Sequence, residues 1–162
     1  MTETSRTLIT TRGEFHDALK QALAEIAAIG CREVFFSDAD FTDWPLSDAA
    51  VIDSLTEWAR GHRRLTLLAQ QFDELARRHG RWVEWRRRWS HRVDCRVNCE
   101  LEASKLPTLL LAPGLVVVRL VDKQHYRGSV SREAADLLQN RETLDAVLQR
   151  SEESFPVTTL GL

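Results

Sequence analysis

The sequence predicts an α/β fold in which a mixed, mostly parallel sheet carries helices on both faces. Between residues 33 and 98, short apolar runs that suit strands alternate with stretches of helical apolar spacing, an order typical of βαβ units and parallel pairing. Two further apolar runs, 107–112 and 115–121, flank Pro113-Gly114. This turn signal predicts a buried strand hairpin at the centre of the fold.

Length and composition are those of a globular domain. The 162 residues are enough for one hydrophobic core, and we predict a single domain over residues 1–162 with its core at about 30–155. Hydrophobic residues make up 43% and the net charge is -2, so overall charge indicates neither a nucleic-acid nor a membrane partner. The polar first residues, the lack of any apolar run near the ~20 residues that span a bilayer, and three unevenly spaced cysteines predict a cytoplasmic protein with reduced thiols.

The first helix has the clearest signals. Thr11 followed by Glu14 forms a capping box. Apolar residues then keep helical spacing to Ile29, and Gly30 is the expected residue after the C-terminus. The preceding residues, up to Thr10, predict a short edge strand.

The middle of the chain predicts the alternating part of the sheet. The expected strands are 33–37, 65–69 and 93–98. A helix capped by Ser47 or Asp48 is expected to run to Gly61, and a second helical region over 72–89 is expected to break at Gly80.

The C-terminal third predicts one more strand and the last helix. Residues 125–130 predict an edge strand after the hairpin, and a helix is expected from Ser131 to about residue 148. The tail after Phe155-Pro156 is expected to be irregular.

The order of elements from about 30 to 155 resembles one half of a phospholipase D-like domain, as in bacterial proteins related to that superfamily. The stretches Asp43-Trp-Pro-Leu46 and Ser90-His-Arg-Val-Asp94 resemble theirs in local wording. Catalytic members pair two halves to complete one site, so the resemblance implies a homodimer by analogy.

Catalytic members carry His-x-Lys-x-x-x-x-Asp on the strand leading into the hairpin, with glycine just after the aspartate. Placing that glycine on Gly114 puts the three positions at Leu106, Thr108 and Pro113. The family histidine attacks phosphorus and the lysine neutralises phosphate oxygens, and none of these residues is retained here. The later Gly-Ser-x-Asn of the family is only echoed by Gly128-Ser-Val-Ser131. The resemblance therefore implies a catalytically degenerate domain without a cofactor.

Residues 77–92 are rich in arginine and tryptophan and form the most unusual segment. The residues that we single out as possible anion- or partner-binding residues are Arg77, Arg78, Arg81, Trp82, Trp85, Arg86, Arg87, Arg88 and Trp89. The tryptophan spacing places the indoles on one helical face, which is typical of a core stripe with the arginines in solvent. The alternatives are a partner hot spot and single-stranded nucleic acid held by guanidinium and indole.

His125 and Arg127, with Lys123 and Ser129 nearby, could hold a phosphate. The competing interpretation, which we favour, is a polar edge strand, because a nucleophilic histidine also needs an orienting partner and none is evident in the sequence.

Two groups of potential metal ligands lack the required patterns. Asp38, Asp40 and Asp43 have no calcium-loop spacing, and aspartates of this kind commonly cap turns. Cys95 and Cys99, with His91 before them, are not spaced as a zinc site. We predict no metal.

Three functional hypotheses remain. The leading one is a non-enzymatic binding or interaction domain, expected to form a homodimer and to avoid membranes. The second is an anion or nucleic-acid binder that uses the arginine-rich helix. The third is a phosphoesterase with a rebuilt site near His125.

Overall fold

The computed structural model describes residues 6–155. The strands in this range are β1 (Arg6–Ile9), β2 (Glu33–Ser37), β3 (Arg64–Ala69), β4 (Val93–Val97), β5 (Thr108–Ala112), β6 (Val116–Asp122), β7 (Arg127–Ser131) and β8 (Glu152–Glu153). The helices are α1 (Arg12–Ile29), α2 (Ala49–Ala59), α3 (Asp73–Arg78), α4 (Gly80–Arg88) and α5 (Ala134–Leu148), with short 3-10 turns η1 (Ser90–Arg92) and η2 (Ala103–Lys105).

The strands form one mixed sheet in the order β1-β7-β6-β5-β2-β3-β4-β8. The mixed sheet is confirmed, but the expectation that it would be mostly parallel is corrected. Parallel pairing is limited to β2 with β3 and β3 with β4, whereas the other five pairings are antiparallel. Only these two parallel connections contain the helical crossovers that parallel neighbours need, while short turns join β5, β6 and β7.

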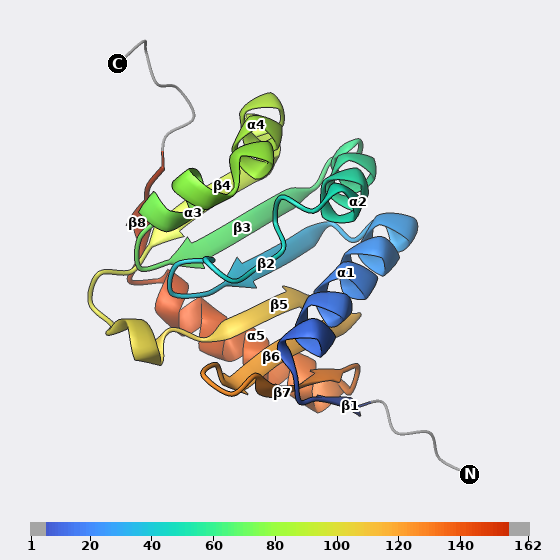
Figure 1. Ribbon diagram of the computed structural model, residues 1–162, viewed down its shortest axis with the longest axis vertical. Helices are drawn as coiled ribbons and strands as arrows, with labels where there is room; N and C mark the ends of the chain where they lie inside the picture. The colour runs from blue at the N-terminus through green and yellow to red at the C-terminus, as the bar shows by residue number, and fades with distance from the viewer. Residues whose placement is uncertain (1–5, 156–162) are drawn as a thin grey trace.

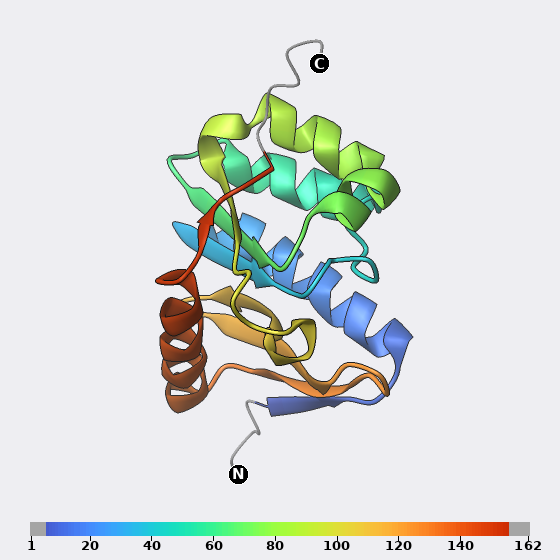
Figure 2. The same cartoon turned by 90° about the vertical axis from the view of Figure 1, so that its left-hand side faces the viewer.

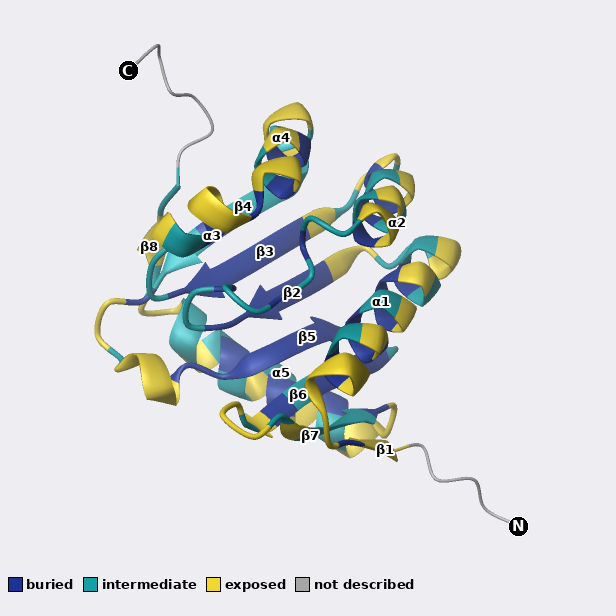
Figure 3. Ribbon diagram, viewed as in Figure 1, coloured by how far each residue is buried: buried dark blue, intermediate teal, exposed yellow. Residues whose placement is uncertain are grey.

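Helices cover both faces of the sheet, as predicted. Helices α1, α2, α3 and α4 lie on one face and α5 crosses the other (Figures 1 and 2). The larger apolar cluster fills the space under α1, α2 and α4, and a smaller cluster lies between α5 and the sheet. Buried residues concentrate in the central strands β2, β3 and β5 (Figure 3).

Helix α1 begins and ends at the predicted signals. The Oγ1 atom of Thr11 accepts a hydrogen bond from the backbone N–H of Glu14 at 3.1 Å. The Glu14 carboxylate in turn accepts from the backbone N–H of Thr10 at 2.7 Å. Gly30 ends the helix with φ of 81°, a left-handed conformation that glycine adopts without strain.

The other predicted helix boundaries of the middle segment are also confirmed. Asp48 caps α2 by accepting from the backbone N–H of Ala50 at 2.9 Å. The helical region after β3 divides into α3 and α4 at His79-Gly80. Each strand–helix unit of this segment therefore follows from local signals.

Two expectations for the C-terminal third are wrong in detail. Strand β7 is not an edge strand, because β1 pairs along its outer side. Helix α5 begins at Ala134 rather than at Ser131, although the Ser131 hydroxyl accepts from the backbone N–H of Glu133 at 3.2 Å. The tail after Phe155 lies outside the described residues.

Within residues 6–155, none of the helices combines the length and the apolar character needed to cross a membrane.

Candidate functional site

The positions of the family's catalytic motif lie at two ends of β5. Leu106 follows η2 and is buried, and Thr108 is the first residue of β5 and is also buried. Pro113 lies beyond the other end of the strand, in the turn to β6. The three side chains therefore do not meet, and neither of the two at the strand entrance carries a nucleophile that a base could activate.

Thr108 belongs to a buried polar network around Asp38. The Asp38 side chain, which follows β2, is fully buried. Its Oδ1 atom accepts from the Thr108 hydroxyl at 2.6 Å and lies 2.9 Å from Nζ of Lys123. Its Oδ2 atom accepts from the backbone N–H of Phe41 at 2.8 Å. The network ties the loop after β2 to the start of β5 and to the β6–β7 turn.

The other two aspartates of this loop also have protein partners. Asp40 accepts from the backbone N–H of Thr42 at 3.0 Å, and Asp43 binds Arg12 and the Tyr126 hydroxyl. Burial raises the pKa of Asp43, but the hydrogen bonds from Tyr126 and Arg12 outweigh it and hold this pKa below the ordinary value. These carboxylates thus fix the loop. No group of three potential metal ligands is found in the described part of the chain.

His125 has an orienting partner that the sequence did not reveal. Its Nδ1 atom lies 2.9 Å from Oδ2 of Asp122 in the β6–β7 turn, and this hydrogen bond lowers the pKa of Asp122. The spacing of three residues within a turn was the available signal. The histidine side chain is 67% exposed, so the pair lies at the surface.

Cys95 and Cys99 have different environments. Cys95 is buried in β4, and burial raises the pKa of its thiol to about 11 against the smaller opposite effect of Arg86. Cys99 follows the strand and is exposed, as is the side chain of His91 in η1.

The tryptophans near α4 belong mainly to the core. Trp82 and Trp85 are buried, and Trp89 is partly buried against the same cluster. Arg86 is buried too: its Nε donates to the Cys95 sulfur at 3.2 Å, and its guanidinium lies over the Phe155 ring. The structure therefore assigns the indole stripe to the core, the interpretation favoured from its spacing, and places Arg86 inside.

The remaining arginines of this segment are exposed. Arg77 and Arg78 contact Glu74, and Arg87 contacts Glu84. Among residues 6–155, no carboxylate lies within 4 Å of the Arg81 or Arg88 guanidinium. These two arginines line a groove of about 360 Å³ between α2 and α4, whose floor includes Ile52 and Trp85.

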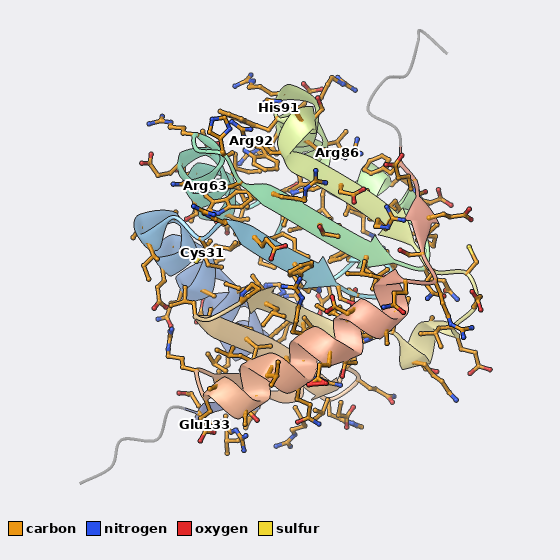
Figure 4. All side chains as sticks on the ribbon, turned by 180° about the vertical axis from the view of Figure 1, so that it is seen from behind. Cys31, Arg63, Arg86, His91, Arg92 and Glu133 are labelled. Atoms are coloured by element: carbon orange, nitrogen blue, oxygen red, sulfur yellow. The ribbon has the colours of Figure 1, made fainter. Side chains whose placement is uncertain are left out.

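Tertiary structure adds a second basic segment to this one. The parallel register pairs Leu65 with Val93, so the basic residues at 60–64 lie beside those at 86–92. Figure 4 shows Arg63, His91 and Arg92 at the same end of the molecule. Residues 60–92 contain ten of the 22 basic residues and three of the 24 acidic ones, a net charge of +7, whereas the rest of the chain has −9. A segment-by-segment charge count would have revealed this separation.

The comparisons with known proteins identify the fold. No family model and no curated protein sequence matches the chain. Among solved structures, it is similar to TrmBL2, described as an archaeal chromatin protein with a novel mode of DNA binding, with a TM-score of 0.65, 12% identity and 93% of this chain covered. The chain spans 54% of that protein.

Two further similar structures are nuclease-like proteins that are covered completely. NucT from Helicobacter pylori has a TM-score of 0.61 and 10% identity over 94% of this chain. Nuc from Salmonella typhimurium, a phospholipase D family member, has a TM-score of 0.61 and 6% identity over 95%. The phospholipase D-like fold is therefore confirmed, and at these identities the likeness concerns the fold alone.

Proposed function

We propose that this chain is a non-enzymatic binding domain on a phospholipase D-like scaffold. The observation that carries the proposal is the entrance of β5. Leu106 and Thr108 lie where the resemblance puts the family's histidine and lysine, and the Thr108 hydroxyl is engaged by buried Asp38. Leu106 has no group that can attack phosphorus, and Thr108 has no charge to neutralise phosphate oxygens.

A phosphodiesterase assay tests the missing chemistry. We expect no turnover of bis(p-nitrophenyl) phosphate by the purified chain. The His125–Asp122 pair is the competing source of activity, so the assay is repeated with His125→Ala. Turnover that this substitution abolishes would replace the binding domain with a phosphoesterase whose site is the β6–β7 turn.

We further propose a homodimer, by analogy with members that pair two halves. Two edge strands, β1 and β8, are available for pairing in the described residues. Light scattering at increasing protein concentration measures the mass directly. A constant mass of one chain up to high concentration contradicts the dimer.

A second candidate function is binding of a polyanion such as nucleic acid. It is supported by the net charge of +7 on residues 60–92 and by the DNA binding described for TrmBL2. Because Trp82 and Trp85 are buried, contacts would go to phosphates rather than to stacked bases. Duplex DNA is then expected to bind at least as well as a single strand.

Fluorescence anisotropy with labelled duplex at low salt tests this candidate. The triple variant Arg78→Ala, Arg81→Ala, Arg88→Ala is expected to weaken binding and to reduce the salt dependence by about one per lost phosphate contact. The control variant Arg127→Ala, Arg132→Ala, Arg150→Ala removes the same charge from exposed sites elsewhere. Equal weakening by both variants would contradict a localised surface.

A further inference from the structure

A cleft opens at the end of the β5–β6 hairpin that is remote from the Pro113-Gly114 turn. It has a volume of about 830 Å³ and lies between η2, the ends of the two strands and α5. Figure 4 shows α5 crossing this face of the sheet. The size is that of pockets which bind small molecules.

Arg119 forms part of the wall of this cleft. It lies opposite Leu109 in the hairpin, on the face that α5 covers. Its Nη1 donates to Oδ1 of Asn140 on α5 at 2.6 Å. Its Nε atom is buried without a protein partner in the described residues. The guanidinium is therefore held in place by a neutral amide and keeps unused donor capacity.

The cation of Arg119 also lacks a protein counter-charge. Among residues 6–155, no carboxylate lies within 4 Å of it, whereas neighbouring Arg141 binds Glu33 and Asp145. A partly buried guanidinium without a carboxylate is stabilised by any anion that reaches it, because its charge is poorly solvated.

Two further cations lie on the lining. Lys105 of η2 is exposed and has no acidic partner within 4 Å in the described range, and Lys123 is engaged by Asp38. Asp122 is the one acidic residue of the lining, and its carboxylate binds His125. The walls also contain the apolar side chains of Leu106, Leu120 and Val147.

We propose that this cleft binds a small organic oxyanion, a carboxylate or phosphate joined to an apolar group. The oxyanion pairs with Arg119, whose planar donors suit two-oxygen groups, and Lys105 adds charge at the rim. The apolar part contacts Leu106, Leu120 and Val147. This assignment rests on the proposed binding function and names its ligand class. It uses the α5 face of the hairpin, whereas the Thr108 side chain turns toward Asp38.

Phenyl phosphate and phenylacetate are suitable probes, with 2-phenylethanol as the neutral control. Isothermal titration calorimetry measures affinity, and the Arg119 Nε–H signal in an NMR spectrum reports contact at the site. We expect at least one anionic probe to bind and to shift this signal. Arg119→Met should weaken that binding about tenfold or more, Arg119→Lys should weaken it less, and Arg127→Met should leave it unchanged. The neutral control should not bind.

Unchanged affinity in Arg119→Met, or no binding of either anion to the wild type, overturns this proposal. Both outcomes leave the non-enzymatic domain intact, since that proposal fails on phosphodiester turnover instead. Circular dichroism of Arg119→Met verifies the fold, and a Lys105→Met variant supplies a second test if Arg119→Met unfolds. Lys105→Met should weaken the anionic probes alone, and equal affinity would count against the site.

Discussion

The Nζ atom of Lys123 lies 2.9 Å from Oδ1 of Asp38, a carboxylate that is fully buried at the end of β2. The same oxygen accepts the hydroxyl hydrogen of Thr108. One carboxylate thus joins three segments that are far apart in the sequence. Since the lysine is the cation nearest to it, the pair should matter for stability.

Lys123→Met is expected to destabilise the protein by about 1–3 kcal/mol, because it leaves the buried Asp38 carboxylate without its cation. Adding Asp38→Asn should recover part of the loss, since a neutral amide is less costly to bury. Urea denaturation gives the free energies of unfolding. Lys105→Met, with no ion pair in the described residues, should change stability by less than about 0.5 kcal/mol, and an equal loss there would refute the pairing argument.

Asp43 predicts a loss of stability in acid. Its pKa is lower in the folded state than the unfolded value of about 3.9. Its contribution is therefore complete above that value and declines as the pH falls through the folded pKa. Denaturation of wild type and Asp43→Asn at pH 7 and at pH 3 should show a stability gap that narrows in acid. A gap that stays constant would show that the Asp43 charge contributes nothing.

Gly128 should not tolerate a side chain. A Cβ atom at this position would lie 1.9 Å from the backbone oxygen of Arg119, so Gly128→Ala must separate β6 from β7 locally. We expect a loss of about 3 kcal/mol or more. Gly80→Ala is the matched control, because nothing lies within 4 Å of a Cβ there. Thermal unfolding compares the two variants, and similar melting temperatures would contradict this packing.

The three thiols should react at different rates. Cys99 is exposed, Cys31 is intermediate and Cys95 is buried with a pKa of about 11. Reaction with a disulfide reagent at pH 8 should modify Cys99 first and Cys95 last, because the thiolate is the reactive form. Single Cys→Ser variants assign each phase. Rapid modification of Cys95 in the folded protein would contradict its buried position.

The stability contribution of Cys95 has the opposite pH direction. Its folded pKa lies above the ordinary thiol value, so folding favours the protonated form. The contribution is complete below the unfolded pKa and is lost as the pH rises toward about 11. Denaturation at pH 8 and pH 10.5 should show a smaller decline for Cys95→Ala than for wild type, and parallel declines would exclude this source.

Local signals in the sequence determined much of the fold. The Thr11–Glu14 box and Gly30 fixed the ends of α1, and the alternation after residue 33 predicted β2, β3 and β4 with their helices. Such signals succeed because caps and periodicity depend on neighbours in the chain. The spacing of Trp82 and Trp85 likewise indicated the core stripe that the structure contains.

Only the tertiary structure decided which distant residues meet. The pairing of β1 with β7 made β7 an inner strand, because register and edge position depend on long-range hydrogen bonds. The contact of Asp38 with Lys123 and that of Arg119 with Asn140 follow from the same long-range packing. The sequence by itself determined the elements and their apolar faces, whereas packing between them placed the charges, since no local pattern encodes a partner so far along the chain.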